Sequence, residues 1–135
     1  LRDSYDIRPG LENWPFLPIG TPEGLAAALL GTGDQVGILL DTGHAHIALS
    51  RGWCQQPDAR AFVEALPAPI VEVHLHDNRG MDDEHLMPGE GTADLHGLLE
   101  AVFATGFRGP ITIECDLEAK GRPGLAAALA QIREK

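Results

Sequence analysis

Apolar residues recur along the chain with two spacings. Short, nearly continuous apolar runs are typical of buried strands, and apolar residues at every third or fourth position are typical of helices. The runs that predict strands are Val36–Asp41, Ile70–His76 and Pro110–Cys115, with a weaker one ending near Glu12. Helical spacing follows Thr21-Pro22 and recurs over Gln56–Leu66, Leu95–Phe103 and Pro123–Arg133. Strands and helices in alternation predict four βα units of an α/β fold with a parallel sheet.

The ends of two helices are marked by their residues. Thr21 can cap the first helix because its hydroxyl can accept from a free backbone N–H, and Pro22 suits the first helical position. Gly106 stands where a helix commonly ends in a left-handed glycine. The pattern therefore predicts that the first helix begins after Thr21 and that the helix over Leu95–Phe103 ends before Gly106.

One segment breaks the regular alternation. Residues 77 to 94 form a glycine-rich, acidic stretch with neither strand nor helix spacing. Loops of this length inside a compact domain are usually functional or disordered. We expect this one to be functional.

Polar residues stand at the ends of the four predicted strands. The four are Glu12, Asp41, His74 and Glu114. The carboxyl ends of parallel strands meet at one edge of an α/β sheet, where active sites of such folds lie. Carboxylates and an imidazole together suit a divalent cation such as Mn²⁺, Mg²⁺, Co²⁺ or Zn²⁺. We therefore predict that these four side chains converge on a metal ion.

Further candidates surround this set. His44 lies three residues after Asp41, and Asp83 and His85 form an Asp-x-His pair in the long loop, so these three could bind a second metal or the substrate. Arg79 is a candidate for a hydroxyl or phosphate contact, and Trp14 for a pocket wall. Three other histidines are less informative. His46 and His96 are interpreted as ordinary helix residues, and the pattern leaves His76 undecided.

The composition of the chain narrows the classes of molecule that the protein could bind. The 135 residues include 20 acidic and 10 basic side chains, a formal net charge of −10, and 44% are hydrophobic. This length supports one domain, and an acidic chain without a basic block is a poor ligand for nucleic acid. The apolar runs are too short for a membrane span. Cys54 and Cys115 match no metal or redox spacing, so we expect reduced thiols in a cytoplasmic protein.

Six motifs follow one another along the chain: LENWP (11–15), DTGHAHI (41–47), HLHDNRG (74–80), DEH (83–85), PGEGTAD (88–94) and ITIEC (111–115). In this order they resemble a known family, the C-terminal half of the xylose isomerase-like TIM barrels. The resemblance implies a (β/α)8 barrel, with Glu12, Asp41, His74 and Glu114 as metal ligands. It also implies that His44, Asp83 and His85 match additional ligands of the endonuclease IV branch. Because a complete barrel has about 250 residues and the chain begins at Leu1, we expect residues 1–135 to be half of a longer barrel.

The leading hypothesis is a metal-dependent isomerase or epimerase of a small sugar, sugar phosphate or related hydroxy-carbonyl compound. Glu12 and Glu114 would serve as base and acid, while Asp41 and His74 would mainly hold the metal. One alternative is an endonuclease IV-like phosphodiesterase acting on abasic DNA, which the acidic charge disfavours. Another is an inactive half-barrel that serves in assembly, for example a homodimer that pairs its open sheet edges to complete a barrel.

Overall fold

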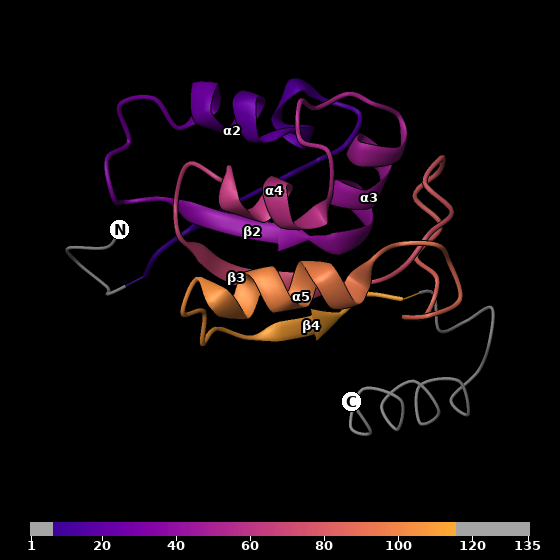
Figure 1. Ribbon diagram of the computed structural model, residues 1–135. Helices are drawn as coiled ribbons and strands as arrows, with labels where there is room; N and C mark the ends of the chain where they lie inside the picture. Colours follow the sequence, from indigo (N-terminus) through magenta and orange to yellow (C-terminus); the bar gives the residue numbers. More distant parts are fainter. Residues whose placement is uncertain (1–6, 116–135) are drawn as a thin grey trace.

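A computed structural model describes residues 7–115. The elements follow one another along the chain as strand, helix and strand (Figure 1). They are β1 (Gly10–Glu12), the 3-10 helix η1 (Pro18–Gly20), α2 (Pro22–Ala28), β2 (Gly37–Asp41), α3 (Thr42–Ser50), α4 (Ala59–Glu64), β3 (Ile70–Leu75), α5 (Leu95–Ala104) and β4 (Ile111–Ile113). The predicted helix over Pro123–Arg133 lies outside the described residues.

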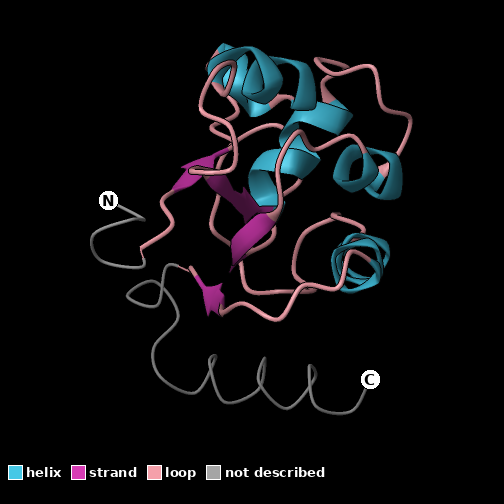
Figure 2. Cartoon of the chain, turned by 90° about the vertical axis from the view of Figure 1, so that its left-hand side faces the viewer, coloured by secondary structure: helices cyan, strands magenta, loops and turns pink. Residues whose placement is uncertain are grey.

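The strands form one parallel sheet in the order β1-β2-β3-β4. Asp41 pairs with His74 in the register of β2 and β3, and His74 pairs with Thr112 in the register of β3 and β4. In Figure 2 the described helices lie along one side of the row of strands. Neighbouring parallel strands in chain order, covered by helices on one side, are the arrangement of a TIM barrel, and the predicted fold class is confirmed.

The core lies between the sheet and the helices. In β3 the side chains of Val73 and Leu75 are buried, whereas the alternate residue His74 is only half-buried on the other face. Helices α4 and α5 supply Phe62 and Val102, which have no exposed surface. Burial of one such side chain contributes about 1.5–3 kcal/mol, so the helix-facing side of the sheet is the main source of stability.

Side-chain caps fix where the helices begin. Thr21 accepts a hydrogen bond from the backbone N–H of Gly24, which confirms the predicted start of α2. Asp58 caps α4 in the same way, so this helix begins at Ala59 rather than at Gln56 as predicted. Gly106 has a φ of +85°, as expected for the left-handed residue that follows α5.

Helix α3 is not among the helices that the apolar spacing predicted. His46 was interpreted as a helix residue, and the helix that contains it begins at Thr42, directly after β2. The reason is Asp41, whose carboxylate accepts a hydrogen bond of 2.8 Å from the backbone N–H of His44 and caps the helix. His44 is therefore in the first turn of α3 and is buried against the end of the sheet.

The long loop, residues 77 to 94, is organised around one buried carboxylate. Asp77 accepts hydrogen bonds from the backbone N–H groups of Asn78 (2.8 Å), Gly89 (3.0 Å), Gly91 (2.9 Å) and Ala93 (3.1 Å). A side chain at Gly91 would collide with Asp77, because a Cβ there would lie 2.3 Å from its Oδ1. The loop is thus an ordered part of the domain.

The described helices are all short. None of them combines the length and the apolar character needed to cross a lipid bilayer.

Candidate metal centre

Four polar side chains meet at the carboxyl edge of the sheet. Glu12 ends β1, Asp41 ends β2, His74 is near the end of β3 and Glu114 directly follows β4. One potential ligand atom from each of them lies within 4.8 Å of the others. The structure therefore brings together the four residues that the sequence placed at the strand ends. We call this group cluster one.

His74 is the centre of cluster one. Its Nδ1 lies 2.6 Å from Oε2 of Glu114 and 3.9 Å from Oε1 of Glu12. On the other side of the ring, Nε2 lies 3.7 Å from Oε1 of Glu72, which is two residues earlier on the same face of β3. This distance is longer than a hydrogen bond, and Oε1 of Glu72 instead accepts a 2.8 Å hydrogen bond from the hydroxyl of Thr112.

Asp41 is held so that one carboxylate oxygen remains available. Its side chain is completely buried, and Oδ1 accepts the hydrogen bond from His44. The Asn13 amide accepts from the backbone N–H of Asp41 (2.8 Å) and donates to its carbonyl (3.1 Å), which fixes the end of β2 against the end of β1. Oδ2 accepts no hydrogen bond from the described residues. A buried carboxylate oxygen without a partner is costly, and a cation would satisfy it.

The electrostatics of cluster one also favour a cation. Burial raises the pKa of Glu12, and the neighbouring carboxylates of Asp41 and Glu114 raise it further against the opposing effect of His44 and His74. Three carboxylates and one imidazole form an oxygen-rich donor set that suits Mn²⁺, Mg²⁺, Co²⁺ or Zn²⁺. The residues present therefore fit a divalent metal ion, although they do not select one of these four.

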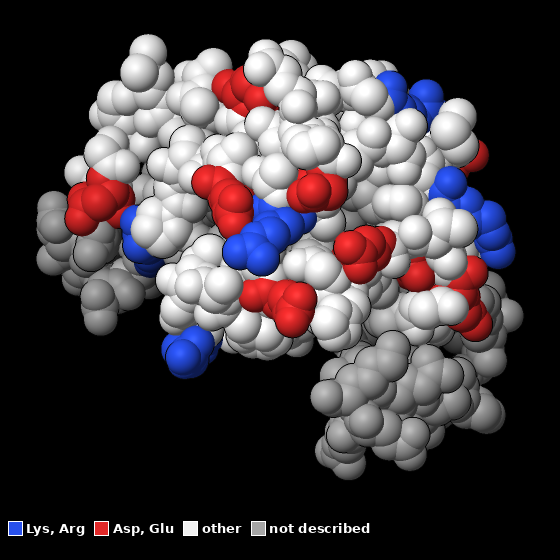
Figure 3. Space-filling model, viewed as in Figure 1, with Lys and Arg blue, Asp and Glu red and all other residues white. Residues whose placement is uncertain are grey.

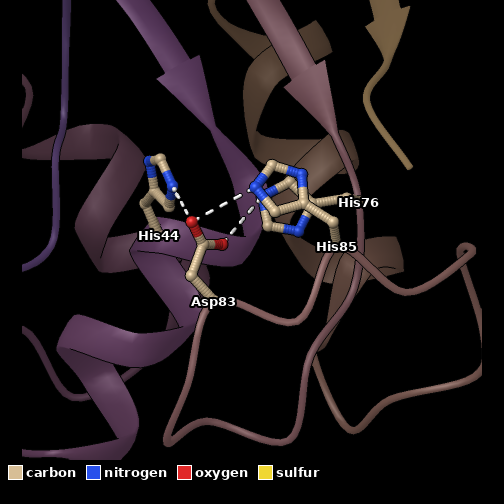
Figure 4. A group of neighbouring side chains, drawn as sticks. All are labelled: His44, His76, Asp83 and His85. Atoms are coloured by element: carbon tan, nitrogen blue, oxygen red, sulfur yellow. Dashed lines mark hydrogen bonds and ion pairs between the residues drawn. The ribbon is translucent and has the colours of Figure 1, made fainter. Parts of the chain in front are cut away.

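A second group lies beside the first, since His44 is 3.5 Å from Glu12 and His76 is 2.8 Å from Asp41. It consists of His44, His76, Asp83 and His85, whose potential ligand atoms also lie within 4.8 Å of one another (Figure 4). We call it cluster two. Asp83 is at its centre, with Oδ2 at 3.2 Å from Nε2 of His44 and at 3.2 Å from Nε2 of His85.

The charge of Asp83 is maintained by these histidines. Burial would raise the pKa of this carboxyl group, but the hydrogen bond with His44 and the nearby rings of His85 and His76 outweigh burial and hold the pKa below its ordinary value. Imidazoles with a single carboxylate are the donors typical of zinc sites. Cluster two is thus a nitrogen-rich candidate site next to an oxygen-rich one.

The backbone at His85 is strained. Its φ is +47°, the only positive φ among the described residues other than glycine. The ring is anchored by a 2.8 Å hydrogen bond between Nδ1 and the carbonyl oxygen of Glu114, and it stacks on His76 at a centroid distance of 4.2 Å. Strain of this kind persists only where surrounding contacts enforce it, and it is concentrated at functional sites.

His44 connects the two clusters. Its Nδ1 lies 3.5 Å from Oε1 of Glu12 and 3.6 Å from Oδ1 of Asp41, whereas its Nε2 faces Asp83. The Trp14 ring meets His44 edge-on at 4.9 Å and is 41% exposed. Trp14 therefore borders the clusters from the solvent side rather than packing in the core.

The remaining sequence candidates lie apart from both clusters. Arg79 forms an exposed ion pair with Glu84 within the long loop, and no contact between Arg79 and either cluster is present in the described structure. His46 on α3 hydrogen-bonds Thr92, and His96 is exposed on α5. Neither of these two histidines joins a cluster, in agreement with their interpretation as ordinary helix residues.

Sequence reasoning missed three residues that shape the site. His76 was left undecided, and Asn13 and Asp77 were not considered. All three are buried polar residues. Asn13 and His76 are the first residues after β1 and β3, and Asp77 is the second residue after β3. Their position just beyond a strand end was the signal in the sequence that could have identified them.

The xylose isomerase-like TIM barrel family model matches residues 1–135. The chain belongs to this family. An uncharacterised protein of Methanocaldococcus jannaschii is 38% identical over 122 residues, which are 84% of this chain and 39% of that relative. The chain thus spans well under half of that relative.

Two solved structures share the fold. A D-tagatose 3-epimerase-like protein superimposes with a TM-score of 0.79 and 33% identity, covering 98% of this chain and 48% of that one. The IolI protein, solved with a bound zinc atom, gives a TM-score of 0.59 and 22% identity over 84% of this chain and 42% of its own. The IolI likeness extends to the fold alone. In both comparisons the chain corresponds to less than half of the solved structure.

Proposed function

We propose that this chain is the metal-binding half of a divalent-metal-dependent isomerase or epimerase acting on a small sugar or a related hydroxy-carbonyl compound. The observation that carries the proposal is cluster one, in which donors from four strand ends surround the unpartnered oxygen of the buried Asp41. The similarity to a D-tagatose 3-epimerase-like protein supports the same class of reaction. Because the chain spans about half of that structure, the activity belongs to the complete barrel.

Glu12, Asp41, His74 and Glu114 would hold the cation. Bound there, a divalent cation supplies Lewis acidity that stabilises negative charge on the carbonyl and hydroxyl oxygens of the substrate. Asp41 and His74 serve mainly as fixed donors, because the first is completely buried and the second contacts Glu114 at 2.6 Å through Nδ1.

Glu12 and Glu114 would move the proton. Glu12 ends β1 and Glu114 follows β4, the two outer strands of the described sheet, so they can approach a substrate from different sides. The pKa of Glu12, raised by burial, brings this carboxyl group closer to the neutral range in which a general acid or base works best. Two carboxylates of this kind suit epimerisation, in which a proton leaves one face of a carbon and returns to the other.

The neighbouring residues would bind and shield the substrate. Trp14 offers an exposed ring beside His44, where it could cover the apolar face of a sugar. Arg79 would have to leave Glu84 to contact a hydroxyl or phosphate group. His44, Asp83 and His85 would bind a second cation or the substrate itself.

The test is turnover of a panel of ketoses and aldoses by the Mn²⁺-loaded protein, followed by chromatography. Glu12→Gln and Glu114→Gln should each lower kcat at least about 100-fold, the usual contribution of a positioned acid or base. His96→Gln, on the exposed face of α5, is the matched control and should retain full activity. Unchanged turnover in both glutamate variants would exclude the proposed acid and base.

Cluster two also makes phosphodiester hydrolysis a second candidate, because a nitrogen-rich site beside an oxygen-rich one could hold two or more cations around a phosphate. The net charge of −10 opposes binding to DNA. Figure 3 shows separate arginine side chains among acidic ones on the face that it presents, with no continuous basic area among the described residues. Incision of a duplex containing an abasic site, abolished in His85→Asn, would favour this candidate over the sugar reaction.

A further inference from the structure

His76 lies between the two clusters. The residue follows the last residue of β3, and its side chain is completely buried. Its Nε2 lies 2.8 Å from Oδ1 of Asp41, in cluster one, and 3.7 Å from Oδ1 of Asp83, in cluster two. One imidazole nitrogen therefore contacts a carboxylate of cluster one and lies within 4 Å of a carboxylate of cluster two.

The ring of His76 is held from every side. Gly43 lies against it so closely that a Cβ at that position would be 2.0 Å from Cε1 of the ring. His85 stacks on the ring with an interplanar angle of 12°. The Thr42 hydroxyl donates to the carbonyl oxygen of His76 (2.8 Å) and accepts from its backbone N–H (3.1 Å). The position of the imidazole is thus fixed by two elements other than its own strand.

The geometry separates His76 from the other members of cluster two. A metal ion binds in the plane of an imidazole ring, along the lone pair of the nitrogen. The rings of His76 and His85 are stacked and nearly parallel, so their lone pairs run side by side and do not meet at one cation. Nε2 of His76 is also nearer to Asp41 than to Asp83. Both observations point to a contact with Asp41 rather than to metal ligation.

We propose that His76 is a positioning residue that orients Asp41 for the cation of cluster one and links that carboxylate to Asp83. This inference rests on the proposed function only in requiring a cation at cluster one. Oδ1 of Asp41 accepts a hydrogen bond from the backbone N–H of His44 and lies 2.8 Å from Nε2 of His76, whereas Oδ2 accepts no hydrogen bond from the described residues and is available to a cation. Without His76, the carboxylate loses one of its two restraints and can rotate away from the metal.

The experiment measures the affinity of cluster one for Mn²⁺ by electron paramagnetic resonance of the free ion. Cluster two is first disabled by Asp83→Asn, which leaves the stacking of His85 on His76 in place, so that one site is titrated. In this background His76→Leu should weaken Mn²⁺ binding about 10–100-fold, the usual effect of losing a partner that orients a ligand. His76→Gln should recover part of the affinity because its amide can still donate to Asp41. His96→Leu, which removes an exposed imidazole from α5, should leave the affinity unchanged.

A second variant tests the same inference without removing the imidazole. Gly43→Ala should weaken Mn²⁺ binding in the same direction because the new Cβ displaces the ring of His76. Alanine is the better helix former of the two residues, so helical content by circular dichroism should not fall with the affinity. Loss of affinity with the helices intact is not expected of a residue with a purely structural role.

The outcomes distinguish the two proposals. Unchanged Mn²⁺ affinity in both His76→Leu and Gly43→Ala would overturn the positioning role. A different result would also overturn it. If His76→Leu, made without the cluster-two variant, removed a second bound ion and left the affinity of cluster one unchanged, His76 would be a ligand of cluster two. Absence of Mn²⁺ binding by the unaltered protein would instead refute the proposed function, and the role of His76 with it.

Discussion

Asp41→Asn is the substitution that separates the cost of a buried charge from the benefit of a cation. The side chain is completely buried, caps α3 through Oδ1 and leaves Oδ2 without a hydrogen-bond partner among the described residues. Asparagine has the same shape and caps a helix about as well as aspartate. The substitution therefore keeps the cap and removes the charge that a cation would require.

The expected magnitude follows from ligand linkage. A cation present at 100 times its dissociation constant adds about 2.7 kcal/mol to the free energy of unfolding. For a domain of this size, about 4 °C in Tm corresponds to 1 kcal/mol, so the unaltered protein should gain about 10 °C in saturating Mn²⁺. Asp41→Asn should lose nearly all of this gain. In a chelator its stability should stay within about 1 kcal/mol of the unaltered protein, because the cap remains and an unpartnered charge is gone.

The assay is thermal unfolding followed by circular dichroism, with Mn²⁺ and with a chelator. Asp58→Asn is the matched control, because Asp58 caps α4 with the same 2.8 Å hydrogen bond and lies outside both clusters. This control should keep the full metal-dependent gain. If Asp41→Asn kept the gain as well, Asp41 would not be a metal ligand and the argument from its unpartnered oxygen would be wrong.

Three further predictions follow from the long loop, a histidine and the sheet. Asp77→Ala should destabilise the protein by about 3 kcal/mol in urea unfolding and speed hydrogen exchange in the loop, because four backbone N–H groups lose their acceptor. Burial lowers the pKa of His46 below its ordinary value of 6.5, so the unfolded chain takes up this proton at a higher pH than the folded one. The free energy of unfolding should therefore fall as the pH drops below about 6.5. In a chelator, His46→Gln should reduce the slope of this free energy against pH, and an unchanged slope would contradict the prediction. Strands β1 and β4 each pair on one side only in the described sheet, so light scattering should detect a dimer or larger species, and a monodisperse monomer would contradict pairing through these edges.

Much of the fold and of cluster one could be predicted from the sequence because both depend on local periodicity. Alternation within a strand determines which residues share a face, and parallel strands bring their carboxyl ends to the same edge. Glu12, Asp41 and His74 could therefore be placed together before any contact was known. The caps at Thr21 and Gly106 are equally local, since each depends on a few neighbouring residues.

Cluster two was less predictable because its geometry depends on long-range contacts. Asp83 and His85 belong to a loop without periodicity, and their positions depend on the hydrogen bonds of Asp77 and on the backbone strain at His85. The side chain of Asp41 caps α3, so this helix begins at Thr42 and its first turn holds His44 between the clusters.

The sequence by itself determined the alternation of strands and helices, the acidic charge and the four polar residues at the strand ends. Only the tertiary structure decided the role of His76, because this residue lies one position beyond β3, where strand alternation no longer specifies a direction. The position of its ring is set by two residues outside β3: Gly43, which belongs to α3, and His85, which belongs to the long loop. Contacts between segments that are far apart in sequence leave no periodic signal, and such contacts join the two clusters.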